Sequence, residues 1–351
     1  MNGRAESGED RLIGWLRGSL QRGGKADLLG DDAALFPGSP GTMVATVDSQ
    51  VAGVHVPEDL DAGLLAARLL HVNLSDLAAM GTARSRSEES ASTWCHALVT
   101  LATPEAFDHR HFFSVLLDEC AAAGVALAGG DLASSRTLTA TMTLMAHQPD
   151  GWRPVRRSGA RPGDALWIGG TVGESGAGLR LLRRGARLTA HGERAHVFLP
   201  PELRGDGPVA DAARRAVRRH LRPRAQLELG AWLSSRPEGE HPAGLDLSDG
   251  AARDLPRLAR ESGVGLELDA AELPLSEGFT ELCAALESDP IDLALGGGED
   301  YVLAFALPEG VQPPTRFRCR RVGRVRREKE LVLVRNGKRE AWPEMGWDHL
   351  G

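Results

Sequence analysis

The stretch Gly129-Gly130-Asp131 follows an apolar, strand-like run at 125–128, and further acidic segments of the chain echo it. Each echo places one or two carboxylates beside Gly, Ser or Asn; the echoes are GDD at 30–32, VDS at 47–49, NLSD at 73–76, DLSDG at 246–250 and GGGED at 296–300. Carboxylates that gather in one place repel one another unless a cation neutralises them. Mg²⁺ prefers oxygen ligands, typically a few carboxylates together with phosphate oxygens and water. The pattern therefore predicts a polycarboxylate site for Mg²⁺ and a nucleotide, assembled from distant segments.

Each of these segments also has a purely structural interpretation. Asp and Gly are common in turns, and Asp often caps a helix, as Asp76 could do within its helical segment. For one segment alone the turn is the commoner meaning, and only the repetition along the chain favours a shared site. Glycines at a strand end, as at 129–130, let backbone N–H groups approach a phosphate closely.

Length and charge bound the class of protein. A chain of 351 residues is too long for one ordinary core and predicts two domains. The turn-rich segment RPVRRSGARPG at 153–163, which follows Asp150-Gly151, places the boundary between domains at 1–150 and 151–351. The net charge of −7 argues against a nucleic-acid partner, because a phosphate-backbone binder usually carries a basic field.

Cysteine usage and hydropathy predict a reduced, cytoplasmic protein with no membrane partner. Cys95, Cys120, Cys283 and Cys319 form no CxxC pair and no zinc spacing. The polar, acidic start of the chain does not resemble a signal peptide. No apolar run approaches the roughly 20 residues that a membrane-spanning helix needs.

Alternating strand-like and helix-like patterns indicate a mixed α/β protein. In the first half we expect helices at 9–20, from 57 to 81 and at 110–124, and strands at 43–49, 93–101, 125–128 and 137–147. In the second half we expect strands at 164–170, 244–248, 264–268, 301–307, 317–325 and 330–335, and helices ending near 184 and spanning 208–221, 224–234, 251–262 and 276–286. The stretch 185–202 reads as irregular.

The familiar phosphate-binding motifs are absent. No G-x-x-x-x-G-K-[ST] occurs, no G-x-G-x-x-G follows the first strand, and the protein-kinase set is missing. The only lysines are Lys25, Lys329 and Lys338. A chain that is rich in acids and glycines but poor in lysines indicates that metal ions neutralise the phosphates.

An ordered set of motifs resembles the thiamine-monophosphate kinase family, within the wider aminoimidazole-ribotide-synthetase-like superfamily of ATP enzymes. The motifs are GDDAALF at 30–36, VDSQVAGVH at 47–55, NLSDLAAMG at 73–81, GGDLASS at 129–135, RSGARPGD at 157–164, GESGAGL at 173–179, HLRPRAQLELG at 220–230, LDLSDG at 245–250, GGEDY at 297–301 and GWDHL at 346–350. They span nearly the whole chain. The resemblance implies a two-domain α+β fold, whose N-terminal sheet domain binds ATP and Mg²⁺ and forms a homodimer, followed by a C-terminal α/β domain.

The resemblance also implies a reaction and a set of site residues. The reaction is ATP-dependent phosphorylation of thiamine monophosphate to thiamine diphosphate, by direct in-line transfer with several Mg²⁺ ions. The implied metal positions are Asp32, Thr46, Val47, Asp48, Asp76, Asp131, Asp246 and Asp249; those for ATP are Gly130, Asp131, Arg157 and Ser248; those for the thiamine substrate are His55, Glu299 and Trp347. An indole such as Trp347 can stack on a cationic thiazolium or on a pyrimidine.

Some positions depart from the family pattern. Val47 stands where the family usually has Thr, so that a backbone carbonyl would have to replace a hydroxyl ligand. Leu132 and Ala133 replace the usual Thr pair after Gly-Gly-Asp, and Glu174 stands where Asp is commoner.

Alternative functions fit the sequence to different degrees. An aminoimidazole-ribotide synthetase fits the motifs less well. A selenophosphate synthetase would carry a reactive cysteine near its N-terminus, and the hydrogenase-maturation relative ends in cysteine, whereas here no cysteine precedes Cys95 and the last residue is Gly351. A non-catalytic nucleotide-binding scaffold would have had no reason to keep the acids at the metal positions.

Overall fold

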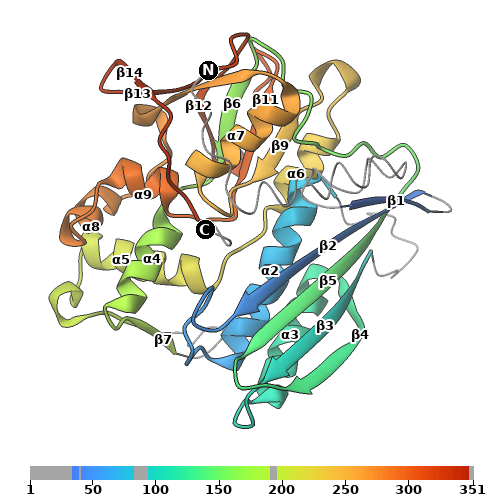
Figure 1. Cartoon of the computed structure of the whole chain (residues 1–351), viewed down its shortest axis with the longest axis vertical. Coiled ribbons are helices and arrows are strands. Elements are labelled where there is room, and N and C mark those ends of the chain that lie inside the picture. Colours follow the sequence, from blue (N-terminus) through green and yellow to red (C-terminus); the bar gives the residue numbers. More distant parts are fainter. Residues whose placement is uncertain (1–33, 39–40, 83–93, 190–195, 348–351) are drawn as a thin grey trace.

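The computed structural model describes residues 34–38, 41–82, 94–189 and 196–347, and of residues 34–38 only the backbone. The helix expected at 9–20 and the predicted metal ligand Asp32 lie outside these residues. Figure 1 shows two sheets with helices packed around them.

The first sheet contains five strands in the order β1-β2-β5-β3-β4. The strands are β1 (Ala34–Gly38), β2 (Gly41–Val51), β5 (Thr139–Gln148), β3 (Cys95–Thr103) and β4 (Val125–Ser134). Neighbouring strands run antiparallel except β3 and β4, which are parallel. One face of this sheet, here called the inner face, packs on helices α2 (Ala62–Ala79) and α3 (His109–Ala123).

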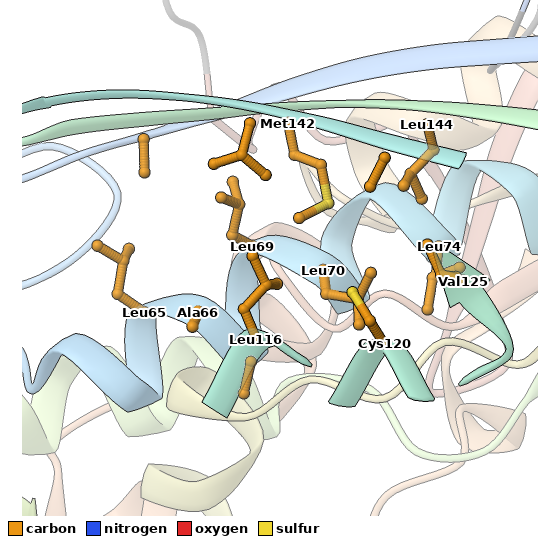
Figure 2. Packing of buried hydrophobic residues seen from close by; sticks show 14 of the residues in the cluster. Leu65, Ala66, Leu69, Leu70, Leu74, Leu116, Cys120, Val125, Met142 and Leu144 are labelled. Atoms are coloured by element: carbon orange, nitrogen blue, oxygen red, sulfur yellow. The ribbon is translucent and has the colours of Figure 1, made fainter. Parts of the chain in front are cut away.

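Alternation along the strands produces this inner face. In β3 every second residue is buried, beginning with Cys95, and in β5 the buried positions include Met142 and Leu144. Side chains of a strand point alternately to the two faces of a sheet, so one apolar set meets the helices. Figure 2 shows Met142 and Leu144 packed over Leu69 and Leu70 of α2.

Helix α2 is buried almost all round. It begins at Ala62, later than the pattern starting at 57 suggested, because the side chain of Asp61 caps it and accepts a hydrogen bond of 3.0 Å from the Leu64 backbone. The turn after the helix contains Gly81 in the left-handed region, with φ of 75°. One side of α2 contacts the first sheet, and the helix also contacts α6 (Leu227–Ser234) and strand β9 (Ala243–Asp246) of the second half. It is therefore shared by both halves.

The second sheet contains seven strands in the order β14-β13-β10-β12-β6-β11-β9. The remaining strands are β6 (Ala165–Gly169), β10 (Gly265–Asp269), β11 (Leu303–Leu307), β12 (Cys319–Arg326), β13 (Leu331–Arg335) and β14 (Lys338–Ala341). The helices of this half are α4 (Glu174–Arg183), α5 (Pro208–Leu221), α6, α7 (Ala251–Ser262), α8 (Phe279–Ala285) and α9 (Pro290–Gly296). The turn signal Asn336-Gly337 does join β13 to β14 as a hairpin.

Several expected boundaries were wrong. Strand β4 does not stop at Gly129 but continues to Ser134, because its ladder with β3 extends through Thr100↔Asp131. Gly130 fits there only as glycine, since an added Cβ would lie 1.8 Å from the Val99 carbonyl oxygen. Strand β2 continues past Asp48 to Val51.

The stretch expected to be irregular holds a short hairpin of β7 (Arg187–Thr189) and β8 (His196–Phe198). Helix α9 was not expected. The side chain of Asp289 caps it through the backbone N–H groups of Ile291 and Asp292, and Pro290 occupies its first turn.

Candidate functional site

A cavity of about 130 Å³ lies where the first sheet meets the second half of the chain. It is lined by Asp48, Gln50, Val54, His55, Leu179, Arg183, Ser248, Asp249, Gly297, Gly298, Glu299, Tyr301 and Trp347. All three residues predicted to contact the thiamine substrate line it, together with the predicted metal positions Asp48 and Asp249 and the predicted ATP contact Ser248. Residues separated by nearly 300 positions in the sequence thus share one cavity.

Two short hydrogen bonds fix further predicted acids. Thr46 of β2 donates from Oγ1 to Asp76 Oδ2 at 2.5 Å, and Ser75 of α2 donates from Oγ to Asp246 Oδ2 at 2.6 Å. Because Ser75 and Asp76 are adjacent, α2 carries one acid and orients another that belongs to β9. The NLSD segment therefore connects β2, the strand that carries Asp48, with the DLSDG segment.

The DLSDG and GGED segments lie side by side through backbone hydrogen bonds. Leu247 N–H donates to Val302 O at 2.9 Å, Tyr301 N–H to Leu247 O at 2.9 Å, and Glu299 N–H to Ser248 O at 2.6 Å. Glu299 and Tyr301 are in the left-handed region, with φ of 57° and 49°. Such residues cost about 1–3 kcal/mol each and persist where their surroundings determine them. This strained turn carries the Glu299 side chain to the cavity.

Asp249 is already engaged by cations. Its Oδ2 accepts from Arg257 at 2.8 Å and lies 3.8 Å from Arg253 Nε, while its backbone N–H donates to Asp254 Oδ2 at 2.9 Å. Burial, helped by the nearby charge of Asp249, raises the pKa of Asp254 to about 7. Arg157 does not line the cavity and acts electrostatically on Asp254 and Arg257 instead.

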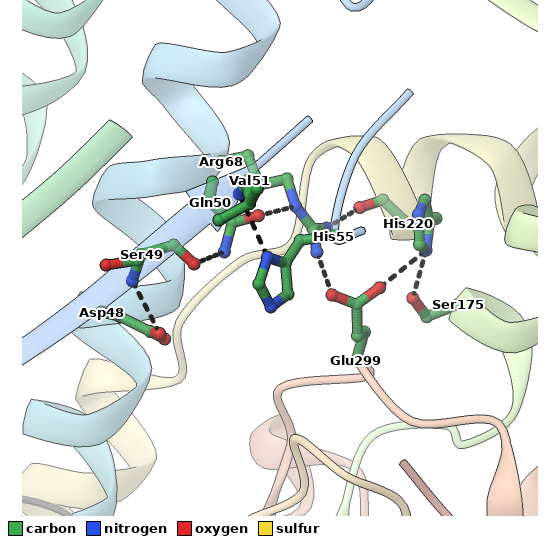
Figure 3. A network of polar contacts seen from close by, with 9 residues as sticks. All are labelled: Asp48, Ser49, Gln50, Val51, His55, Arg68, Ser175, His220 and Glu299. Carbon is green, nitrogen blue, oxygen red and sulfur yellow. Dashed lines mark hydrogen bonds and ion pairs between the residues drawn. The ribbon is translucent and has the colours of Figure 1, made fainter. Parts of the chain in front are cut away.

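His55 and Trp347 border the cavity from opposite ends of the described chain. His55 Nδ1 accepts a hydrogen bond of 3.1 Å from the Val51 backbone, which assigns the proton of a neutral imidazole to Nε2 (Figure 3). The backbone N–H of Trp347 donates to the backbone carbonyl oxygen of Asp249 at 3.1 Å, and 45% of the Trp347 residue remains exposed. The indole is thus held at the cavity by its backbone, while nearly half of the residue remains accessible to a flat ring.

Other predicted residues lie elsewhere. Gly130 and Asp131 belong to the edge strand β4, three strand steps from β2, or roughly 14 Å by ordinary strand spacing. By its register Asp131 shares the outer face of the sheet with Thr100, whereas Asp48 is on the inner face with Thr46. The side chain of Val47 is 61% exposed on the outer face, so only its backbone can serve the inner site.

Among the residues that the structure describes, no three His, Cys, Asp or Glu side chains are grouped so that they could hold a metal ion. Glu174, where the family more often has Asp, accepts from Thr171 at 2.9 Å and from Ser276 at 2.8 Å and lies 3.4 Å from Arg215. These contacts fix the first turn of α4, where Glu174 lies, to Ser276 and to Arg215 of α5.

Gln50, Arg183 and Tyr301 also line the cavity, although none of them was predicted as a site residue. Arg68, which contacts both Gln50 and Glu299, was not predicted either. A signal for Arg68 was available, since it is the one cation in an apolar run of α2, between Leu64-Leu65-Ala66-Ala67 and Leu69-Leu70, and a buried charge needs a partner.

No helix among the described residues is long and apolar enough to cross a membrane.

Comparisons with known proteins agree with this architecture. The model of the AIR synthase related protein N-terminal domain matches residues 30–147. The chain is 32% identical to the thiamine-monophosphate kinase of Escherichia coli K12, covering 92% of this chain and 91% of that protein. It is 30% identical to the thiamine-monophosphate kinase of Aquifex aeolicus, covering 98% and 99%.

Solved structures match over the same length. AaThiL complexed with AMPPCP and TMP superposes with a TM-score of 0.79 at 26% identity, covering 99% of both chains. A second structure, of the Aquifex aeolicus thiamine monophosphate kinase, gives a TM-score of 0.73 at 27% identity, covering 95% of this chain and 98% of that one. The predicted two-part α/β architecture with an N-terminal sheet is confirmed, and the chain belongs to the thiamine-monophosphate kinase family.

Proposed function

We propose that the cavity described above is where the chain performs its reaction, by in-line phosphoryl transfer assisted by Mg²⁺. As a member of its family, the chain phosphorylates thiamine monophosphate to thiamine diphosphate with ATP as co-substrate. The observation that carries the assignment of the site is the meeting of Asp48 and Asp249 with His55, Glu299 and Trp347 around one cavity.

The thiamine substrate is held by His55, Glu299 and Trp347. The thiazolium ring of thiamine is cationic, so the exposed indole and the Glu299 carboxylate offer it an aromatic face and a negative charge. The relative AaThiL was solved with TMP and an ATP analogue, AMPPCP, which fits a site that accepts both substrates.

Oxygen ligands for Mg²⁺ come from the acids of the motifs. Asp48, Asp76, Asp246 and Asp249, with Thr46, would supply hard oxygen atoms of the kind that Mg²⁺ takes together with phosphate oxygens and water. When bound, Mg²⁺ neutralises two anionic substrates that would otherwise repel each other. Asp32, Asp131 and the Val47 carbonyl complete the proposed set.

The chain's own contribution is positioning. The attacking group is a phosphate oxygen that is already anionic, so transfer requires alignment and charge neutralisation more than a strong base. Ser248 and Gly130 contact ATP in this proposal, together with Asp131 and Arg157. No covalent phosphoenzyme is involved.

We further propose that the chain consists of domains 1–150 and 151–351 and acts as a homodimer through the outer face of the first sheet. Support for the domains comes from the two sheets, whose described strands lie on either side of this boundary. Support for the dimer comes from Val47 and Leu98, which are 61% and 39% exposed on that face. Asp131 lies on the same face, so a second copy packed there would lie close to it.

The test is an assay of the purified chain with ATP, MgCl₂ and thiamine monophosphate, in which thiamine diphosphate is quantified by chromatography. We expect formation of thiamine diphosphate that stops when EDTA removes Mg²⁺. ATP hydrolysis with an aminoimidazole-ribotide precursor but not with thiamine monophosphate would favour the synthetase alternative. Nucleotide binding without any product would favour a scaffold.

A further inference from the structure

Arg68 is a completely buried cation at the middle of α2. Its guanidinium has three protein partners from three different parts of the chain (Figure 3). Nε donates to Gln50 Oε1 of β2 at 2.7 Å, Nη1 donates to the carbonyl oxygen of His220 at the end of α5, and Nη2 donates to Glu299 Oε1. The group also lies over the Tyr301 ring, 5.9 Å from its centre.

Burying such a charge is expensive. The loss of hydration is not fully offset even by a close ion pair, and well-packed apolar residues often replace a buried ion pair without loss of stability. Leu69 and Leu70 follow Arg68 in a helix whose neighbouring positions are apolar and buried. Stability alone is therefore a weak explanation for a guanidinium at this position. Its contact with Glu299, which borders the cavity, suggests a role at the site instead.

The Glu299 carboxylate is held from two sides. Oε1 accepts from Arg68, and Oε2 lies 3.3 Å from His220 Nδ1, which in turn is 3.1 Å from Ser175 Oγ. The Glu299 side chain nevertheless remains 21% exposed. These contacts fix the direction of the carboxylate while leaving part of it accessible.

We propose that Arg68 is a positioning residue, which fixes the Glu299 carboxylate for the thiamine substrate and ties it to the strand that carries Asp48. Gln50 lies two residues after Asp48 on the same face of β2, so one guanidinium joins the metal side of the cavity to its substrate side. This inference rests on the proposed substrate role of Glu299.

The test is a double-mutant cycle of Arg68→Met, Glu299→Gln and the double variant. The measurements are kcat and KM for thiamine monophosphate, the Kd of a non-hydrolysable ATP analogue, and the thermal unfolding midpoint. We expect Arg68→Met to raise the KM for thiamine monophosphate about tenfold while the Kd of the analogue changes less than about threefold. When Glu299 is already replaced by Gln, adding Arg68→Met should raise this KM less than about threefold further. The effects of two substitutions that remove the same contact are not additive in free energy.

Two further variants keep the result interpretable. Arg68→Lys retains the charge but lacks the planar guanidinium that reaches three partners. If Arg68→Met does not fold, Arg68→Lys replaces it in the double-mutant cycle. Arg326→Met is the matched control: the Arg326 side chain on β12 is 15% exposed and pairs at 2.9 Å with Glu267 of β10, and neither residue lines the cavity. It should change the unfolding midpoint and leave the KM for thiamine monophosphate unchanged.

Each failure has its own meaning. The inference is overturned if the fold-increase in KM of the double variant equals the product of the two single-variant increases, because Arg68 then does not act through Glu299. It is also overturned if the affinity for the ATP analogue falls as much as the affinity for thiamine monophosphate. If Glu299→Gln alone leaves the KM for thiamine monophosphate unchanged, the substrate role of Glu299 fails first, and the inference fails with it.

Discussion

Ser75 donates a hydrogen bond of 2.6 Å to Asp246, which joins the central helix α2 to strand β9 of the other sheet. The bond holds an acid of the second half against the helix that also carries Asp76, the residue that follows Ser75. Carboxylates proposed to bind a metal are thus aligned by neutral hydroxyl donors, since Thr46 does for Asp76 what Ser75 does for Asp246.

This pairing predicts a graded response. Asp246→Asn removes a negative charge and should lower kcat by at least about 100-fold, whereas Ser75→Ala removes one orienting bond and should cost less than about tenfold. Steady-state kinetics at saturating ATP, with Mg²⁺ varied, measures both. Equal losses in the two variants would mean that the hydroxyl, rather than the acid's charge, matters.

Asp48→Asn should lower turnover to less than about 1% of that of the unchanged protein, because it removes a carboxylate that borders the cavity. The circular dichroism spectrum should stay the same, because Asp48 is only partly buried and is not part of the core. Asp131→Asn is the more informative variant, since Asp131 lies on the opposite face of the same sheet. A comparable loss would extend the site to the edge strand. Near-normal turnover would remove Asp131 from it.

Trp347→Ala should raise the KM for thiamine monophosphate about tenfold and leave the KM for ATP nearly unchanged, because a cation–π contact contributes about 1–2 kcal/mol. Trp347→Phe keeps an aromatic face and should recover part of the affinity. Kinetics with each substrate varied in turn measures the effect. An equal rise in the KM for ATP would contradict an indole that serves only the thiamine ring.

Glu119 predicts a pH dependence of stability. The hydrogen bond from His71, aided by Arg224 and opposed by burial, lowers the pKa of Glu119 from 4.5 to about 2. A lowered pKa stabilises the fold fully above the unfolded value near 4.5, and the contribution is lost as pH falls toward about 2. Glu119→Gln should therefore reduce the free energy of unfolding at pH 7 by about 3 kcal/mol. Urea unfolding at several pH values should show that the difference in free energy of unfolding between the unchanged protein and Glu119→Gln narrows below pH 4.5. A difference that stays constant down to pH 2 would refute this prediction.

If the outer face of the first sheet forms the proposed dimer interface, a single charged substitution on that face should disrupt the dimer. Val47→Glu should convert a dimer to a monomer, because it would bury a carboxylate among apolar side chains. Leu117→Glu is the control, since Leu117 is 52% exposed on α3, away from that face. Sedimentation velocity measures both. An unchanged dimer in Val47→Glu would place the interface elsewhere.

Much of the architecture could be predicted because period-two and helical patterns are local. The expected strands at 43–49 and 137–147 and the helix at 251–262 all correspond to observed elements. Helix α9 was missed because its only local signals are the cap Asp289 and the following proline. The continuation of β4 was missed because glycines usually end strands, whereas here pairing with β3 carries the strand through them.

The site could be predicted as a set of motifs but not as a geometry. Acids beside small residues indicated which segments to follow, and the cavity unites several of them. Which face Asp131 occupies depends on a register shift, in which β4 has one extra residue, Ala128, opposite the step from Ala97 to Leu98 of β3. No pattern within β4 alone indicates this shift. The role of Arg68 depends on Gln50, His220 and Glu299, and no local pattern links these positions.

Helix α2 has almost no surface of its own, since one side lies on the first sheet and other parts touch the second half. Neither half can keep its core intact if this helix leaves. The molecule should therefore melt as one cooperative unit despite its two sheets, and cutting the connection near residue 150 would not release two independently stable fragments.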